Sequence, residues 1–233
     1  MNILITGASK GIGHQICKKF ITDGTHKIIA IARTPKAFDK QLFSSSNVND
    51  TSFTYLNLDL SKINFKEQLL PEVISKLQNI DIIINNAGIL INKPFEKLTD
   101  TDFDYMFNLN VKSIFKLTRD LLSFINKGAH IVNISSMGGL QGSSKFAGLS
   151  LYSASKGALA VLTECLAEEL KDRSISVNAL ALGAVQTEML SNAFPDYNAP
   201  TTASEMADFI FDFALNGHKH FNGKILPVST STP

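Results

Sequence analysis

The chain has 233 residues, 44% of them hydrophobic, which is enough to bury a sizeable core. Its 22 basic and 21 acidic residues leave a formal net charge of +1, too small for the global field that recruits nucleic acid or an acidic membrane surface. Residues 1–7 lack the basic region and apolar length of a signal peptide, and no apolar stretch reaches membrane-spanning length. Cys17 and Cys165 lie far apart in helix-like contexts, so we expect two reduced core thiols. Composition therefore predicts a cytoplasmic protein that binds neither nucleic acid nor a membrane.

Short apolar runs alternate with longer segments of helical periodicity along the chain. The runs around residues 28–31 and 82–84 are nearly continuous in isoleucine, which is typical of strands buried on both faces. Thr99 offers an N-cap to one helix, and Gly24 and Gly128 stand where helices should end. The expected strands are 2–6, 27–32, 52–59, 80–85, 130–135, 174–181 and 224–228, and the expected helices are 12–23, 62–77, 100–126, 152–172 and 203–215. Residues 34–50 predict a weak helix followed by a polar loop.

This alternation implies right-handed crossovers and a parallel sheet covered on both faces. No Pro/Gly/Ser-rich linker divides the sequence, and no internal repeat is visible. Residues 1–233 therefore predict a single α/β domain: a doubly wound, seven-stranded, mainly parallel sheet with helices on both faces.

The stretch TGASKGIG at residues 6–13 follows the first expected strand and opens the first expected helix. Its glycines do not match the G-x-G-x-x-G spacing, so the usual dinucleotide-binding pattern fails letter for letter. The same physics applies, because Gly7 permits a tight turn, Gly13 permits close packing, and a bare helix N-terminus offers N–H groups to a pyrophosphate. The context favours a phosphate-binding loop over a plain strand–helix turn.

The end of the second expected strand bears on the choice of dinucleotide. An NAD site presents a carboxylate to the ribose about 20 residues beyond its glycine loop, but here Arg33 and Thr34 follow the strand and the next acid is Asp39. Arg33 and Lys10 could pair with a 2′-phosphate, or they could be solvated cations on exposed turns. We predict NADP (as NADPH) as the cofactor, with NAD the less favoured choice.

Tyr152 and Lys156 stand four positions apart among small residues, in LYSASKGAL. On a helix, both side chains leave the same face. An isolated pair of this kind would favour a surface location. Here a chemical role is the alternative. An ammonium one turn away, with a cationic nicotinamide ring when the cofactor is oxidised, favours the phenolate and should lower the pKa of the tyrosine from about 10. Tyr152 is then a candidate general acid and base.

Motifs spread in order over nearly the whole chain resemble the short-chain dehydrogenase/reductase family. They are TGASKGIG at 6–13, NNAG at 85–88, the second asparagine of NLNVKSIF, NISS at 133–136, Tyr152-x-x-x-Lys156 and VNALALGAVQT at 177–187. The resemblance is strongest to the 3-oxoacyl-carrier-protein-reductase-like group, whose members reduce many different carbonyls. It implies a Rossmann-type fold and an NAD(P)-dependent oxidoreductase.

The same resemblance implies roles for individual residues. Tyr152 would be the general acid/base, Lys156 would also bond the nicotinamide ribose, Ser136 would hold the substrate oxygen, and Asn110 would anchor a water in a proton relay. Asp59 would contact the adenine or cap a helix, and Thr187 would contact the carboxamide or cap another. The implied cofactor contacts are Gly7, Ser9, Lys10, Gly11, Ile12, Gly13, Arg33, Asp59, Leu60, Asn86, Ala87, Gly88, Tyr152, Lys156, Gly183, Val185 and Thr187. No cluster of metal ligands is evident in the sequence.

The sequence departs from the family pattern around the expected substrate site. Leu182 stands where a proline is usual, and the stretch GSSKFAGLS at 142–150 lengthens the segment before Tyr152. Few residues separate Thr187 from the helix expected at 203–215, so we expect a short cover and an open site, unless the insert at 142–150 supplies the missing wall.

Two functions remain open at this point. One is an NADP(H)-dependent oxidoreductase that interconverts a carbonyl and a secondary alcohol on a small molecule, with acyl thioesters among the candidate substrates. The other is a non-catalytic, cofactor-sensing regulator or scaffold with the same fold. All four chemical positions are present, which favours the enzyme. Apolar residues on more than one face of the helices expected at 100–126 and 152–172 predict a homo-oligomer, a tetramer or a dimer.

Overall fold

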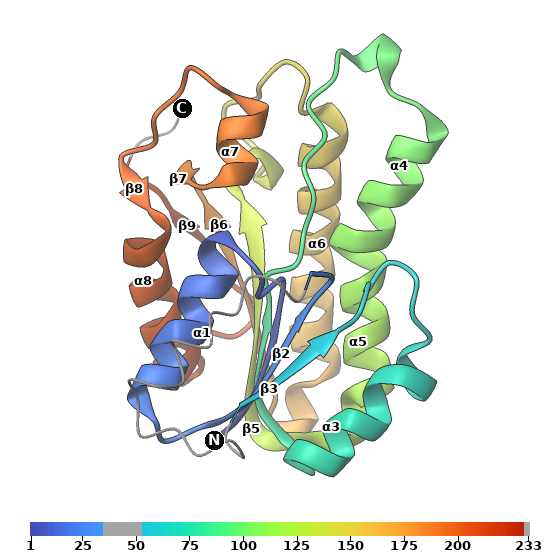
Figure 1. Cartoon of the computed structure of the whole chain (residues 1–233), viewed down its shortest axis with the longest axis vertical. Helices are drawn as coiled ribbons and strands as arrows, with labels where there is room; N and C mark the ends of the chain where they lie inside the picture. Colours follow the sequence, from blue (N-terminus) through green and yellow to red (C-terminus); the bar gives the residue numbers. More distant parts are fainter. Residues whose placement is uncertain (35–52, 231–233) are drawn as a thin grey trace.

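The computed structural model describes residues 1–34 and 53–230. Its centre is a seven-stranded sheet in the order β3-β2-β1-β4-β5-β6-β9, and every pairing in it is parallel (Figure 1). The strands are β1 (Asn2–Thr6), β2 (Lys27–Ala32), β3 (Phe53–Asn57), β4 (Ile80–Asn85), β5 (Ile125–Ser136), β6 (Ser176–Leu182) and β9 (Ile225–Val228). The predicted doubly wound α/β architecture is confirmed.

Helices cover both faces of this sheet. They are α1 (Gly11–Asp23), α3 (Leu70–Leu77), α4 (Asp100–Phe107), α5 (Ser113–Leu121), α6 (Ser150–Glu169), α7 (Glu188–Ala193) and α8 (Ala203–Asn216). Helices α1 and α8 pack on one face, and α3, α5 and α6 on the other (Figure 1). The strands have an apolar residue for each face: Ile3 and Ile5 face α1 and α8, whereas Leu4 belongs to the opposite cluster. This two-sided burial accounts for the continuous isoleucine runs.

The helix predicted over 100–126 is divided. A π-helical turn at Asn108–Lys112 separates α4 from α5, and β5 begins at Ile125, earlier than predicted. The capping box of Thr99 and Asp102 opens α4 as expected, and Gly24 ends α1 with a φ of 73°. The prediction for Gly128 was wrong, because this glycine lies inside β5 with a φ of 83°.

Three short elements had not been predicted. Helix α7 and the two-residue strand β8 (Thr201–Thr202) occupy the stretch after Thr187 that was expected to be a brief connection. Strand β8 pairs with β7 (Val185–Gln186), which lies just before that stretch. The weak helix and polar loop predicted over residues 34–50 lie, apart from residue 34, within residues 35–52, which are outside the described residues.

The two cysteines differ in their surroundings. Cys17 is buried on the core-facing side of α1, but Cys165 is exposed, so the prediction of two core thiols was wrong for Cys165. The helical repeat turns Cys165 and Val161 to the outer side of α6. Within the described ranges, no helix has the length and apolar character needed to cross a membrane.

Candidate active site

A cavity of about 590 Å³ lies at the carboxyl edge of the sheet. Its walls come from the segments that follow β1, β2, β4, β5 and β6, together with α6 and the region of α7. The strand order reverses between β1 and β4, and ligands of open α/β sheets bind at such a switch point.

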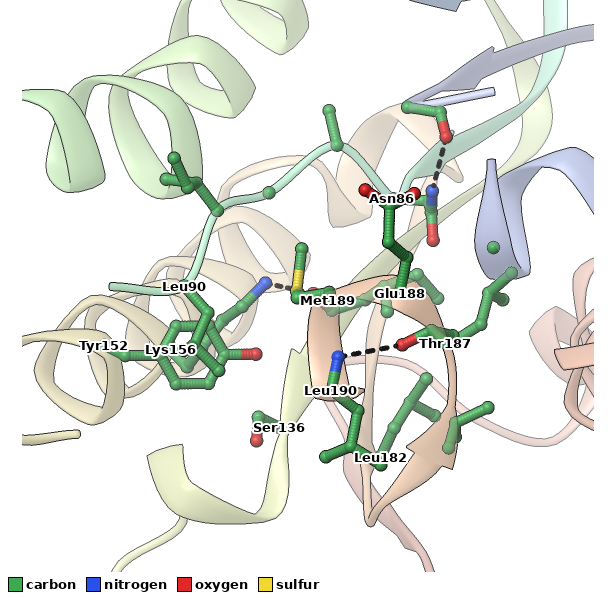
Figure 2. Close-up of a pocket in the computed structure, with 18 of the residues that line it drawn as sticks. Asn86, Leu90, Ser136, Tyr152, Lys156, Leu182, Thr187, Glu188, Met189 and Leu190 are labelled. Carbon is green, nitrogen blue, oxygen red and sulfur yellow. Dashed lines mark hydrogen bonds between the residues drawn. The ribbon is translucent and has the colours of Figure 1, made fainter. Parts of the chain in front are cut away.

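The loop after β1 is packed tightly against the loop after β4. Gly7 has a φ of 70°, and a Cβ atom added there would stand 2.7 Å from the Ala87 Cα atom. A Cβ atom on Gly13 would stand 2.3 Å from the Gly7 carbonyl oxygen. The Asn86 side-chain amide locks the two loops by donating to the Thr6 and Gly7 carbonyl oxygens at 3.2 and 3.1 Å (Figure 2). The predicted tight turn and close packing are therefore present.

The first turn of α1 suits an anion. Lys10 occupies the N-cap position with an extended backbone, and no side chain caps the helix there. The first N–H groups of α1 therefore lack a side-chain partner at the mouth of the cavity, where Ser9, Gly11 and Ile12 also line it.

Both cations predicted to meet a 2′-phosphate have protein partners in this structure. Arg33, at the end of β2, donates to the hydroxyl of Tyr105 on α4. Lys10 forms an ion pair with Glu188, the first residue of α7, at 2.7 Å. Both cations also line the cavity. Neither partner was visible in the sequence, because the pairs lie 72 and 178 positions apart.

Asp59 engages in local contacts. One oxygen of its carboxylate accepts from the Ser61 backbone N–H at 3.0 Å and from the Ser61 hydroxyl at 2.7 Å. Burial acts to raise the pKa of Asp59, but these hydrogen bonds and the charge of Arg33 hold it below its ordinary value. Asp59 is not among the residues that line the cavity, and its carboxylate closes a turn with Ser61. The helix cap considered for it is absent, because the next helical segment begins at Phe65 with Asn64 as its N-cap.

Helix α6 and the end of β5 bring Ser136, Tyr152 and Lys156 to the same side of the cavity (Figure 2). The Lys156 Nζ atom lies 5.8 Å from the centre of the Tyr152 ring. It also donates to the Ile134 carbonyl oxygen at 2.8 Å. The hydrogen bond to β5 thus fixes the Lys156 ammonium next to the Tyr152 ring.

The electrostatics of this pair differ from the prediction. Burial raises the pKa of Tyr152 above its ordinary value, and the interaction with the Ser136 hydroxyl acts in the opposite direction without reversing the effect. Burial lowers the pKa of Lys156 to about 8. The predicted lowering of the tyrosine pKa was therefore wrong for the protein without cofactor, because desolvation dominates.

Asn110 is completely buried in the π-helical turn between α4 and α5. Its side-chain oxygen accepts from the Ile89 N–H at 2.8 Å, and its amide donates to the Ile89 carbonyl at 3.0 Å and to Ser155 at 2.9 Å. Ser155 in turn donates to the Tyr152 carbonyl oxygen at 2.7 Å. Asn110 does not line the cavity but fixes the chain around it. Ser155 was missed, since a small polar residue in SASK carries no distinctive signal.

The small residues near Tyr152 and Lys156 accommodate a piece of backbone. The turn Met137–Gly139, which follows Ser136, packs directly on α6. A Cβ atom on Gly139 would stand 2.6 Å from the Lys156 carbonyl carbon. The Ser136 hydroxyl oxygen accepts from the Gly138 N–H at 3.3 Å. This contact sets the position of Ser136 relative to Tyr152.

A cover of several segments lies beside the cavity. Thr187 caps α7 by accepting a hydrogen bond from the Leu190 N–H at 3.3 Å, and it also lines the cavity. The helix cap and a contact with the cofactor carboxamide are therefore both compatible with the structure. Phe194, after α7, meets Phe146 of the insert edge to face, with ring centres 6.5 Å apart. Asn92 donates to the Ala193 carbonyl at 2.8 Å. The insert at 142–150 therefore does contribute to the cover.

Most of the predicted site residues lie together. Those lining the cavity are Gly7, Ser9, Lys10, Gly11, Ile12, Arg33, Leu60, Asn86, Ala87, Gly88, Ser136, Tyr152, Lys156, Gly183, Val185 and Thr187. Gly13, Asp59 and Asn110 are not among the residues that line the cavity. No group of three or more His, Cys, Asp or Glu side chains that could hold a metal occurs within residues 1–34 and 53–230.

Comparisons with known proteins agree with this architecture. The family model described as short chain dehydrogenase matches residues 1–198. An acetoacetyl-CoA reductase of an Acinetobacter species is 32% identical over 190 residues, which cover 81% of this chain and 75% of that protein. A 3-oxoacyl-(acyl-carrier-protein) reductase of Rickettsia felis is 34% identical, covering 80% of this chain and 73% of its own length. The solved structure described as ElxO with NADP bound superposes with a TM-score of 0.81 at 28% identity, covering 97% of this chain and 96% of that one.

The chain belongs to the short-chain dehydrogenase family. It is an oxidoreductase of this family, and the predicted resemblance to the 3-oxoacyl-carrier-protein reductase group is confirmed.

Proposed function

We propose that this protein is an NADP(H)-dependent oxidoreductase that interconverts a carbonyl and a secondary alcohol, with Tyr152 as the general acid/base. The observation that carries this proposal is the convergence of Ser136, Tyr152 and Lys156 on one side of a cavity that also contains the glycine loop. Residues 1–233 act as a single domain that carries both the cofactor and the catalytic groups.

The residues present fit a dinucleotide. Gly7 and Gly13 allow backbone contacts that a Cβ atom would block, and the N-terminus of α1 offers N–H groups to a pyrophosphate. Arg33 and Lys10 would hold a 2′-phosphate, each giving up its present partner. When bound, NADPH supplies the hydride. The NADP-bound relative described above supports this choice of cofactor over NAD.

Reduction of a carbonyl also requires a proton donor and groups that bind the carbonyl oxygen of the substrate. The hydroxyls of Ser136 and Tyr152 bond that oxygen, and Tyr152 delivers the proton to it as negative charge develops. Lys156, with a pKa of about 8, is mainly protonated at neutral pH. Its charge favours the phenolate left after the transfer and offsets the desolvation that raises the pKa of Tyr152 in the resting protein. Lys156 would also bind the ribose of a bound nicotinamide. Asn110, whose side chain is bonded to Ile89 and Ser155, would anchor a water of the proton relay.

The Tyr152→Phe variant tests this assignment. Loss of the hydroxyl should lower kcat by at least about 100-fold, while the NADPH dissociation constant stays within about threefold. Tyr197→Phe is the matched control, since Tyr197 also lines the cavity but is 38% exposed at its edge. A Tyr152→Phe variant with the kcat of the wild type would show that the acid has been misassigned. Lys156→Ala should weaken both turnover and cofactor binding.

The alternative of a non-catalytic sensor or scaffold is not favoured. A sensor needs the glycine loop but not the buried Tyr152–Lys156 arrangement, and the relatives described above are named as reductases. Two of those names contain acyl thioesters, which supports a small carbonyl compound or an acyl thioester as the substrate here.

We also propose a homo-oligomer, a tetramer or a dimer, located in the cytoplasm. Phe103 on α4, Phe115 on α5 and Val161 on α6 are 49%, 42% and 59% exposed, so each of these helices presents a large apolar side chain to solvent. Leu159 of α6 and Leu170, which follows its last residue, are instead buried in the core. Fewer apolar residues of α6 are therefore exposed than predicted. The outer face of the helix, which carries Val161, still supports self-association.

A further inference from the structure

The part of the cavity next to Ser136 and Tyr152 has an apolar wall. Figure 2 shows Leu90, Met189 and Leu190 on the side where these two hydroxyls lie. The wall joins the segment after β4, the insert at 142–150 and the region of α7. Its members are Leu90, Phe146, Leu149, Met189, Leu190 and Phe194; we call this set the apolar lobe.

The charged side chains that line the cavity, among the described residues, all have partners within the protein. Lys10 and Glu188 pair with each other at 2.7 Å. Arg33, which follows β2, donates a hydrogen bond to the Tyr105 hydroxyl on α4. Lys156 donates to a backbone carbonyl of β5. None of the four supplies a counter-ion to the apolar lobe.

Two cations near the edge of the cover are likewise engaged. Lys93 binds both carboxylate oxygens of Asp102, at 2.8 and 2.7 Å. Lys145 donates to the Leu140 carbonyl at 2.5 Å and to the Ser143 hydroxyl at 2.7 Å. An anionic group on a substrate would therefore lose its hydration in the lobe without gaining a partner, which is strongly unfavourable.

We propose that the substrate is an uncharged ketone, or the matching secondary alcohol, whose carbonyl carries an apolar aromatic body seated in the apolar lobe. The edge-to-face contact of Phe146 and Phe194 supports an aromatic occupant, because such rings offer further edge and face contacts to a planar group. This inference rests on the proposed carbonyl chemistry and adds a substrate class to it.

A pair of ketones that differ at one position tests the proposal. In para-methylacetophenone and para-acetylbenzoate, a methyl group is exchanged for a carboxylate at similar size. With NADPH in excess, kcat/KM should be at least about thirtyfold higher for the methyl compound. Equal values, or a preference for the carboxylate, would overturn the inference while leaving the proposed oxidoreductase function intact.

Binding gives a second readout that does not depend on turnover. The Tyr152→Phe variant loaded with NADPH should bind para-methylacetophenone in calorimetric titration and should bind para-acetylbenzoate at least tenfold more weakly. This result without turnover by the wild-type protein would support the lobe and count against the proposed function. Failure of the methyl compound to bind, or equal binding of the two, would overturn the inference.

A charge placed in the lobe should change the preference. Leu190→Lys supplies the missing counter-ion, so it should narrow the ratio between the two ketones by at least tenfold. Leu190→Met, the neutral control of similar length, should leave the ratio within about threefold of the wild type. An unchanged ratio in Leu190→Lys would show that the substrate body lies elsewhere in the cavity.

Discussion

The Gly139→Ala variant probes how closely the turn after β5 must approach α6. The added Cβ atom would stand 2.6 Å from the Lys156 carbonyl carbon and 2.8 Å from the Gly157 nitrogen, both of which are backbone atoms that cannot rotate away. Reaching the 3.4 Å of an ordinary contact requires a separation larger by about 0.8 Å. Because the turn begins at Ser136 and α6 carries Tyr152 and Lys156, this displacement acts directly on the three groups proposed to hold and protonate the substrate.

Misplacement of reacting groups by about 1 Å lowers rates by roughly 100-fold, so we expect a loss of kcat of that order. The overpacked contact should also cost about 1–3 kcal/mol of folding stability. Activity should therefore be measured as NADPH consumption well below the melting temperature, with calorimetry to verify the fold.

Gly157→Ala is the matched control on the other side of the same contact. Its Cβ atom would approach the Gly139 carbonyl oxygen to 3.3 Å, a distance that a shift of a few tenths of an ångström relieves. We expect its kcat to stay within about threefold of the wild type. A folded Gly139→Ala protein with equally undiminished kcat would refute the argument that this contact positions the catalytic groups.

Four further predictions follow from the same structure. Arg33→Ala should weaken NADPH binding by about 10- to 100-fold and leave NADH binding unchanged, measured by fluorescence titration. Tyr105→Phe removes the partner that Arg33 would give up to the phosphate, so it should not weaken NADPH binding in the same titration. Equal or tighter NADH binding by the wild type would contradict the NADPH preference. Burial lowers the pKa of His130 to about 4, so the unfolded chain binds a proton below about pH 6.5 that the folded protein excludes. The free energy of unfolding of the wild type should therefore fall by about 3 kcal/mol between pH 6.5 and 4, relative to that of His130→Gln. Urea melts in which the two proteins lose the same stability between these pH values would disprove this. Deleting residues 143–145 should change the KM for the substrate more than the affinity for cofactor, and an unaltered KM would remove the insert from the pocket. Sedimentation at micromolar concentration should detect a dimer or tetramer, and a monomer would argue against the exposed apolar face as an interface.

The regular part of the fold could be predicted from sequence because each element carries a local signal. The isoleucine runs of β2 and β4 reflect burial on both faces, and the capping box at Thr99 marks the start of α4. The π-helical turn around Asn110 left no such mark, since its residues are as compatible with an α-helix as their neighbours. Helix α7 was missed because six residues are too few for a clear period.

The site was predictable where one motif supplies the residue and its surroundings, as at Gly7 or Tyr152. It was not predictable where the partner comes from a distant part of the chain. The bonds from Lys10 to Glu188 and from Arg33 to Tyr105 exist only because the fold brings two segments together. The sign of the pKa shift at Tyr152 failed for a related reason, since sequence shows the neighbouring charge of Lys156 but not the amount of water excluded from both groups.

The strand order also has a consequence for how the chain acquires its binding capacity during folding. Strand β1 pairs with β4, β6 must find β9, and parallel pairings between such distant segments form slowly. The cavity takes one wall from Gly7 and another from Phe194, so a nascent chain that has completed β4 already has its glycine loop but no enclosed cavity. The proposed dinucleotide would therefore meet its complete site only late in folding. Its binding would then stabilise the completed fold by mass action and would add nothing to the earlier steps of folding.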